Sequence, residues 1–322
     1  MTAAAARVVP RTTLGAPRAD LEEHLERLRH ALAERDETPT GAWVEESAAE
    51  LAAGSKTGWY LPEPGGGIAF YARRGPAAYG HVHCETGPEV AGLLAEALLD
   101  HLPEEVATLD LGFTGLSGPD ERALAEWLAR RAGSTVIERA AMERTLSDAD
   151  RHFPAEPPAG IDRLPVSAVT LEALTDLDRA AFRGSTDALL LGEEPGAYRR
   201  ALEAMLESRL GRFLGEASAA LVEPEPTRLV GAVLTSERSS RRAVVLELVV
   251  DPERRGQGLG RFLLGWTLRA VWALGYEHVR LWVSVGNESA IGLYRAFGFR
   301  KVLEATIYRW ERPTGPQAQV AR

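Results

Sequence analysis

The chain has 322 residues, of which 45% are hydrophobic and 26% are charged, and its formal net charge at pH 7 is −9. This length accommodates two domains of ordinary size, each with its own hydrophobic core. No apolar run is long enough to cross a bilayer, which excludes a membrane-spanning helix. The acidic balance argues against nucleic acid as the main partner, because binding to its phosphates needs a basic face, and it favours a small cationic or amine substrate.

The first segment of the chain, 1–20, has no apolar stretch that ends at a cleavage site, so we expect a loose leader and a cytoplasmic protein. The single cysteine, Cys84, cannot form an internal disulfide. His81 and His83 alternate on one face of a predicted strand, but no third ligand accompanies them, so no metal site is predicted. The last residues, 313–322, lack apolar periodicity and are predicted to be a disordered tail.

The predicted elements fall into two series of similar order, which suggests a degenerate duplication. The first series forms a predicted N-terminal domain, residues 1–150, and follows from stretches with helical or alternating apolar spacing. Its elements are helix 21–34, strands 68–73 and 80–84, helix 88–102, strand 106–111, helix 120–132 and strand 135–146.

A segment rich in proline, 147–162, separates the two series and is predicted to be a linker. The C-terminal domain, residues 161–312, opens with two amphipathic helices and continues with three strands that we expect to form an antiparallel meander. Its elements are helices 171–182 and 195–210, strands 217–222, 228–235 and 243–250, helix 258–274, strand 278–285, helix 289–297 and strand 300–310.

The most informative feature is a glycine-rich turn at residues 255–260, which follows a β-branched strand and leads directly into an amphipathic helix. Glycines at alternate positions allow successive backbone N–H groups to face one concavity, and the N-terminus of the helix adds its positive dipole end. Arg254, Arg255 and Arg261 flank the turn and can supply charge-assisted hydrogen bonds to phosphate. The turn is therefore a predicted anion site.

Two nucleotide-binding motifs compete with this interpretation. The dinucleotide motif G-x-G-x-x-G is followed by an acidic residue about 20 positions later, and the P-loop ends in G-K-S or G-K-T. Neither motif fits, because no lysine follows Gly260 and the preceding strands form a meander instead of a parallel βαβ unit.

The turn Arg255-Gly256-Gln257-Gly258-Leu259-Gly260 resembles the [Q/R]-x-x-G-x-[G/A] signature by which the GNAT (N-acetyltransferase) superfamily binds the pyrophosphate of CoA. A second block, from Asn287 to Phe299, resembles the superfamily motif N-x-x-A-x-x-L-Y-x-x-x-G-F. The resemblance implies an α/β (α+β) fold made of two tandem GNAT-like domains, each a mixed, mostly antiparallel twisted sheet flanked by helices, with a degenerate N-terminal copy.

The resemblance also implies acetyl-CoA as a cosubstrate and assigns residues to it. In the superfamily, the fourth and fifth strands splay apart, and pantetheine pairs with main-chain groups of the fourth strand. The implied cofactor-binding residues are Leu248, Val249, Val250, Arg255, Gly256, Gln257, Gly258, Leu259, Gly260, Arg261 and Asn287.

Tyr294 and Glu247 are the implied catalytic residues. A phenol near the thioester can donate a proton to the departing thiolate, which is the role assigned to Tyr294. The positions where relatives carry a general base are apolar or aromatic here, namely Trp282 on the fifth strand and Leu246 or Val244 on the fourth. Glu247 is one position off in strand parity, so it reaches the site only if a β-bulge re-aims it.

Without a bulge, either the amine arrives neutral or its proton passes along water to a more distant group. Two tryptophans, Trp282 and Trp310, are candidates for lining the acceptor pocket, although aromatic residues on strands more often pack in the core. The candidate end points for a proton carried by water are Glu247, Ser284, Glu304 and Tyr308.

The N-terminal copy lacks both signatures, since the strand ending at Cys84 enters the next helix at Pro88 without a glycine series or an arginine. The predicted function is an acyl-CoA-dependent N-acyltransferase, with acetyl as the default acyl group and a primary amine of a small molecule as acceptor. A tandem arrangement with one active copy is similar to that of the mycothiol synthases. A catalytically silent CoA-binding or sensor module, and a GNAT-like decarboxylase or O-acyltransferase, remain as alternatives.

Overall fold

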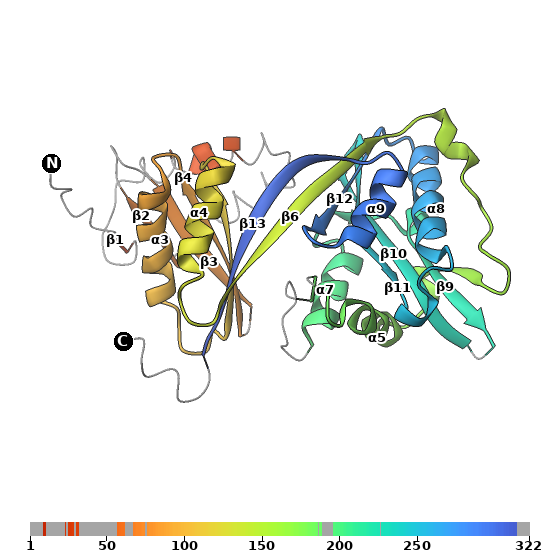
Figure 1. The fold of residues 1–322 in the computed structure, drawn as a ribbon, viewed down its shortest axis with the longest axis horizontal. Helices are drawn as coiled ribbons and strands as arrows, with labels where there is room; N and C mark the ends of the chain where they lie inside the picture. The colour runs from red at the N-terminus through yellow and green to blue at the C-terminus, as the bar shows by residue number, and fades with distance from the viewer. Residues whose placement is uncertain are drawn as a thin grey trace. The chain divides into compact units, whose positions relative to one another are not determined.

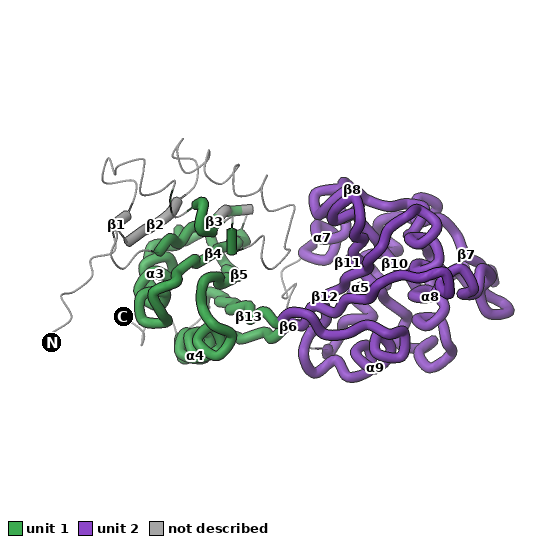
Figure 2. Tube along the Cα trace, turned by 90° about the horizontal axis from the view of Figure 1, so that it is seen from above, with its two compact units in different colours: residues 1–138, 304–322 green, residues 139–303 purple. Residues whose placement is uncertain are grey.

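A computed structural model of the chain describes residues 9–10, 23, 25–28, 30–31, 57–61, 67–74, 76–185, 187–188, 196–225 and 227–313. Apart from strand β1 (Val9–Pro10), the predicted leader lies outside these residues, as do residues 314–322 of the predicted tail. None of the helices in the described part of the chain is long and apolar enough to cross a membrane. The chain divides into two compact units, unit 1 (1–138 and 304–322) and unit 2 (139–303), which are coloured separately in Figure 2.

The sheet of unit 2 carries the predicted meander. Strand β11 pairs antiparallel with β10, and β10 pairs antiparallel with β9, while β11 and β12 are parallel. A parallel pair needs a crossover, and a long helix supplies it. The strands of this sheet, in spatial order, are the end of β6 (Ser134–Thr145), β12 (His278–Ser284), β11 (Arg242–Val250), β10 (Thr227–Ser239), β9 (Ala219–Pro224) and β7 (Asp162–Pro165), with β8 (Arg212–Phe213) paired to β10.

Side chains alternate between the two faces of the sheet along each strand, so both faces carry apolar residues, and helices cover both. Ala232 and Leu234 of β10 pack in one apolar cluster with helices α5 and α7, whereas Val233 packs in another with α8 and α9. Figure 1 shows α5 and α7 side by side and apart from α8 and α9. The predicted helix 171–182 is confirmed, and the other bounds shift by a few residues: α5 is Leu171–Phe182, α7 Ala197–Leu206, α8 Leu259–Ala273 and α9 Glu288–Ala296.

Unit 1 repeats the same order of elements. An antiparallel series leads to a parallel pair, β4 and β5, and helix α3 connects the two parallel strands as α8 connects β11 and β12. The repeated order that we predicted from the sequence is therefore present in the fold. The elements are β2 (Thr57–Leu61), β3 (Gly67–Arg74), β4 (Ala77–Cys84), α3 (Pro88–Asp100), β5 (Thr108–Thr114), α4 (Gly118–Leu128) and the end of β13 (Arg300–Glu311).

The two units differ in extent from the predicted domains 1–150 and 161–312, because each unit contains a strand segment from the other half of the sequence. The segment Arg139–Thr145 of β6 pairs with β12 in unit 2, and the segment Tyr308–Glu311 of β13 pairs with β5 in unit 1. Apolar alternation predicts that a segment is a strand, but it does not say which neighbour the strand pairs with.

The predicted linker also differs from the structure, since part of it is folded within unit 2. Ser147 and Asp150 form a capping box at a short 3-10 helix, Asp148–His152. The carboxylate of Asp150 is buried and pairs with Arg144, and the ring of Phe153 stacks on Phe297 with the centroids 5.2 Å apart. The proline-rich composition predicted a linker, but side-chain contacts fix residues 147–153 within unit 2.

Candidate active site

The glycine-rich turn lies between β11 and α8, where we predicted an anion site. After a 3-10 turn at Pro252–Arg254, the backbone takes positive φ angles of 77° at Gly256 and 83° at Gly258, and Gly258 is the N-cap of α8. No heavy atom lies within 4 Å of a Cβ added at either position. The left-handed backbone, and not crowding, therefore favours glycine at both positions. The turn leaves open space in front of the N–H groups that begin α8.

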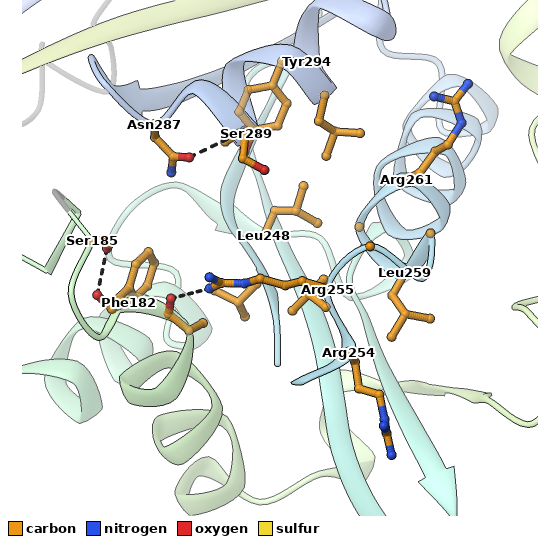
Figure 3. Close-up of a pocket in the computed structure, with 18 residues that line it drawn as sticks. Phe182, Ser185, Leu248, Arg254, Arg255, Leu259, Arg261, Asn287, Ser289 and Tyr294 are labelled. Atoms are coloured by element: carbon orange, nitrogen blue, oxygen red, sulfur yellow. Dashed lines mark hydrogen bonds between the residues drawn. The ribbon is translucent and has the colours of Figure 1, made fainter. Parts of the chain in front are cut away.

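A cavity of about 380 Å³ borders this turn and is shown in Figure 3. It brings together every predicted cofactor-binding residue except Gln257, whose exposed side chain donates to the carbonyl oxygen of Glu253 at 3.5 Å. The residues around the cavity come from α5, β11, the turn, α8 and α9. They are Ala181, Phe182, Ser185, Leu248, Val249, Val250, Arg254, Arg255, Gly256, Gly258, Leu259, Gly260, Arg261, Asn287, Ser289, Ala290, Leu293 and Tyr294.

The three arginines of the turn have different partners. Arg255 donates from Nη2 to the carbonyl oxygen of Ala181 at 2.5 Å, as the dashed line in Figure 3 marks, and so connects the turn to the end of α5. Arg254 forms an ion pair with Glu223 at 2.7 Å. The guanidinium of Arg261 lies over the ring of Phe297, 5.0 Å from its centroid. All three arginines line the cavity, which gives its mouth a positive charge.

Strands β11 and β12 separate at the cavity, as the resemblance implied. Their parallel pairing begins at Arg242 with His278 and ends at Val245 with Leu281. Beyond that point, Leu248, Val249 and Val250 continue β11 paired with β10 on their other side. The N–H of Leu248 donates to the Glu247 carboxylate, and these residues have no strand partner on the β12 side, so a ligand can lie along the strand there.

Strand β11 contains a β-bulge, which was the condition for Glu247 to reach the site. Val245 pairs with Thr235 and Glu247 pairs with the adjacent Leu234, so Leu246 is the extra residue. The extra residue changes the alternation of side chains downstream. As a result, Glu247 lines a second cavity, of about 210 Å³.

The second cavity lies beside the first in unit 2 and contains three carboxyl groups. Asp178 comes from α5, Glu247 from β11, and Asp187 from the short described segment after α5. Trp282 also lines the cavity, as predicted. The other described lining residues are Arg139, Phe182, Ala201, Met205, Val245, Leu246, Leu248, Leu281, Val283, Asn287, Ala290 and Tyr294.

Asp187 is held by three neighbouring side chains. Its Oδ1 accepts a hydrogen bond from Ser284 Oγ at 2.5 Å, and its Oδ2 accepts one from Asn287 Nδ2 at 2.8 Å. Arg139, on the part of β6 that belongs to unit 2, places Nη1 3.7 Å from the same carboxylate. Asn287 also caps α9, because its Oδ1 accepts from the backbone N–H of Ala290 at 3.2 Å. Its contact with the cofactor stays a prediction.

Burial shifts the protonation of the groups around this cavity. Loss of solvation raises the pKa of Asp178 to about 7. Burial, and then the negative charge of Asp178, raise the pKa of Glu247 well above its ordinary value. Burial also raises the pKa of the Tyr294 phenol, with the charges of Glu247 and Asp187 adding to the effect. The site thus combines carboxyl groups that titrate closer to neutral pH with a phenol that stays protonated.

Tyr294 lies where the two cavities meet. Together with Leu248, Asn287, Ala290 and Phe182, it lines both of them. Its side chain is 7% exposed, and its ring packs against Phe299 with the centroids 5.9 Å apart. A group that bridges the two cavities would pass the phenol, which is the position required of an acid that acts on a reacting bond.

Sequence reasoning missed Asp178, Asp187 and Arg139. One signal was available for Asp178, because it interrupts the apolar face of the helix 171–182 between Leu174 and Ala181, where a carboxyl group must be buried. No comparable signal pointed to Arg139, since it enters unit 2 through the strand exchange.

Three residues considered for the site lie elsewhere. Glu304, Tyr308 and Trp310 belong to the part of β13 in unit 1, and they line neither cavity. The Tyr308 hydroxyl is 2.6 Å from Ser134 Oγ, and Trp310 Nε1 donates to the carbonyl oxygen of Ala132 at 3.2 Å. Strand alternation predicts the face of β13 on which these side chains lie. It does not predict that residues 304–311 belong to unit 1 and not to the unit that contains the cavities.

His81 and His83 share one partner in unit 1. His81 Nε2 lies 2.9 Å and His83 Nδ1 3.0 Å from the same hydroxyl oxygen, Thr114 Oγ1. This contact links the ends of the parallel strands β4 and β5. Within the described ranges, no group of three or more histidine, cysteine or acidic side chains is arranged to hold a metal ion.

The chain is similar to known acetyltransferases in sequence. The model of the Acetyltransferase (GNAT) family matches residues 172–299. A mycothiol acetyltransferase of Frankia casuarinae is 29% identical over 181 residues, which are 53% of this chain and 52% of that protein. The ribosomal protein bS18 alanine N-acetyltransferase of Escherichia coli (strain K12) is 39% identical over 72 residues, 22% of this chain and 47% of that protein. The chain thus spans about half the length of these curated relatives.

Solved structures share the fold over nearly the whole chain. A GCN5-related N-acetyltransferase from Sphaerobacter thermophilus matches with a TM-score of 0.61 and 20% identity, covering 96% of both chains. A tandem GNAT protein from the clavulanic acid biosynthesis pathway matches with a TM-score of 0.54 and 16% identity, covering 96% of this chain and 99% of its own. The match to the Acetyltransferase (GNAT) family model lies within unit 2, at residues 172–299, and these solved structures share the fold of the chain.

Proposed function

We propose that unit 2 transfers an acetyl group from acetyl-CoA to a primary amine of a small molecule. The observation that carries this proposal is the position of Tyr294, between a cavity bordered by the glycine-rich turn and a second cavity lined by carboxyl groups. The first cavity suits a long ligand with a phosphate-bearing end, and the second suits a cation. An acyl donor and an amine acceptor would meet at the phenol.

The first cavity fits the parts of acetyl-CoA. The open turn at Gly256 and Gly258 and the N-terminus of α8 would hold the pyrophosphate, with Arg255 and Arg261 nearby. The unpaired side of β11 at residues 248–250 would pair with the amides of pantetheine. In this orientation, the thioester end points toward Tyr294.

The second cavity supplies the proton transfers. An ammonium group must lose a proton before its nitrogen can attack the thioester carbon, and Glu247, whose pKa is raised by burial, is suited to accept it. As the C–N bond forms and the C–S bond breaks, Tyr294 donates its proton to sulfur. The nitrogen then loses its second proton, which replaces the one that left the phenol. The products are the N-acetyl amine, CoA and one proton released to solvent.

The first test is release of CoA from acetyl-CoA in the presence of a panel of primary amines, including a cysteinyl amine because several relatives are mycothiol acetyltransferases. We expect amine-dependent release that Tyr294→Phe lowers by two orders of magnitude or more, on the scale of lost general acid catalysis. Tyr276→Phe is the matched control, because it removes a hydroxyl that donates to Glu237 outside both cavities.

Two outcomes would contradict the proposal. Binding of CoA without release by any amine would indicate a CoA-binding module in place of an enzyme. Equal activity of Tyr294→Phe and Tyr276→Phe would remove the phenol from the reaction.

A further inference from the structure

The three carboxyl groups of the second cavity are not equivalent. Asp187 is occupied by Ser284, Asn287 and Arg139. Asp178, in contrast, is 2% exposed, and its Oδ1 has no hydrogen-bond partner in the part of the chain that the structure describes. A buried carboxylate oxygen without a partner costs free energy that a bound donor can recover. The Oδ1 of Asp178 can therefore accept a hydrogen bond from a bound ligand.

Glu247 also lines this cavity, where its carboxylate accepts a hydrogen bond from the backbone N–H of Leu248. It projects from β11, whereas Asp178 projects from α5, and both line the same space of about 210 Å³. The charge of Asp178 is one of the causes that raise the pKa of Glu247, so the two groups oppose each other's ionisation. A cation placed between them would stabilise both charges at once.

A substrate carboxylate, by comparison, has no cation available to it there. Arg139 is the one basic side chain among the described residues that line this cavity, and it already faces Asp187. Burial lowers the pKa of Arg139, while Asp187 and Glu247 act to raise it. An anion that drew Arg139 away would leave Asp187 uncompensated and would meet the repulsion of Asp178 and Glu247.

We propose that the acceptor is a cationic small molecule that Asp178 and Glu247 hold by its reacting primary amine, and that bears no carboxylate on the carbon next to that amine. Diamines, amino sugars and amides of amino acids belong to this class, and free α-amino acids do not. The proposal deepens the proposed function and rests on it for the reaction, but the binding preference stands on the cavity alone.

Matched acceptors test this preference on the intact protein. Agmatine and arginine differ only by the carboxylate next to the primary amine, as do isopentylamine and leucine, and cadaverine carries no carboxylate. Calorimetric titration of the CoA-saturated protein should give at least tenfold tighter binding of each decarboxylated amine than of its amino acid. Equal affinity for the two members of each pair, or no binding of cadaverine and agmatine at millimolar concentration, would overturn the proposal.

Substitutions assign the preference to Asp178. Asp178→Asn should weaken binding of cadaverine at least tenfold and narrow the difference in affinity between agmatine and arginine. Asp176→Asn is the matched control, because Asp176 lies on the same helix, is exposed, and pairs with Arg179 at 3.1 Å. Unchanged binding of cadaverine by a folded Asp178→Asn variant would refute the assignment. Should that variant fail to fold, the comparison of matched acceptors on the unaltered protein still decides.

The two proposals fail in different ways. If agmatine binds more tightly than arginine but no amine releases CoA, acetyl transfer is refuted and the acceptor class stands. If CoA is released as fast with arginine as with agmatine, acetyl transfer stands and the acceptor class is refuted.

Discussion

At the scale of single residues, the site depends on carboxyl groups that the fold keeps from water. Asp178 occupies a position of α5 that the helix turns toward the sheet, between Leu174 and Ala181, which are both buried. An apolar residue there would pack without cost, so a carboxyl group at this position lowers stability. Such a cost is typical of positions that serve binding or catalysis.

The cost of burying Asp178 should be visible as a dependence of stability on pH. Its pKa is raised to about 7 in the folded protein, against about 3.9 in an unfolded chain. Between these two values the folded state binds more protons, so the free energy of unfolding falls as pH rises from about 4 to about 7. Asp178→Asn removes this contribution and should lose less stability between pH 5 and pH 8 than the unaltered protein, with a difference of a few kcal/mol.

Denaturant unfolding at the two pH values measures this difference, and Asp176→Asn provides the reference for an exposed carboxylate on the same helix. Part of the slope should remain in Asp178→Asn because the pKa of Glu247 is raised as well. An Asp178→Asn variant with the full slope of the unaltered protein would show that Asp178 ionises normally in the folded state.

Glu247 should set the dependence of the reaction on pH. A base acts in its deprotonated form, so the rate should rise with pH through the raised pKa of Glu247, whose cavity also contains Asp178, Asp187, Arg139 and Tyr294. Glu247→Gln should lower kcat/KM on the order of 100-fold or more and flatten this rise, while leaving the affinity for CoA unchanged.

The control for Glu247→Gln is Glu277→Gln, which alters an exposed partner of Arg241 outside both cavities. Rates of CoA release between pH 6 and pH 9 distinguish the variants. A Glu247→Gln variant that keeps the pH profile of the unaltered protein would assign the base to another group.

At the scale of elements, the proposed cofactor site depends most on the connection from β11 to α8. The strand loses its partner β12 beyond Val245, and the turn that follows presents the start of α8. Motif and spacing predicted this connection well, because a glycine-rich turn between an apolar strand and an amphipathic helix has few other interpretations. The bulge at Leu246 was harder to predict, because strand alternation alone placed Glu247 on the wrong face.

Two glycines of α8 allow a test of the turn. Gly258 begins the helix with φ of 83°, and Gly275 follows its end with φ of 86°, and neither has a heavy atom within 4 Å of an added Cβ. Replacing either glycine with alanine should cost a similar amount of stability, about 1–2 kcal/mol. Gly258→Ala should in addition weaken CoA binding at least tenfold, because it disturbs the N–H groups at the cavity.

Calorimetric titration with CoA, beside thermal unfolding of both variants, separates these effects. Gly275→Ala should bind CoA as the unaltered protein does. Equal CoA affinity in the two variants would mean that the turn does not contact the phosphates.

At the scale of the whole molecule, each unit contains a strand segment from the other half of the sequence, Arg139–Thr145 in unit 2 and Tyr308–Glu311 in unit 1. The duplication was predictable from the order of elements, since each half of the sequence contains the same series of strands and helices. The exchange was not predictable, because residues 135–146 and 300–310 both have ordinary strand patterns. Pairing partners are set by tertiary packing, which a single sequence does not display.

This exchange predicts which fragment of the chain can fold. Residues 161–312, the domain suggested by the sequence, lack the segment Arg139–Thr145 that pairs with β12. Without it, β12 becomes an edge strand, and the apolar cluster loses the buried side chains of Ala140 and Met142. Residues 139–303 retain both the strand and Arg139.

We therefore expect fragment 139–303 to unfold in one cooperative thermal transition and to bind CoA, whereas fragment 161–312 should aggregate or lack such a transition. Circular dichroism and CoA titration of the two fragments check this expectation. Cooperative unfolding with CoA binding by fragment 161–312 would show that the segment Arg139–Thr145 is dispensable.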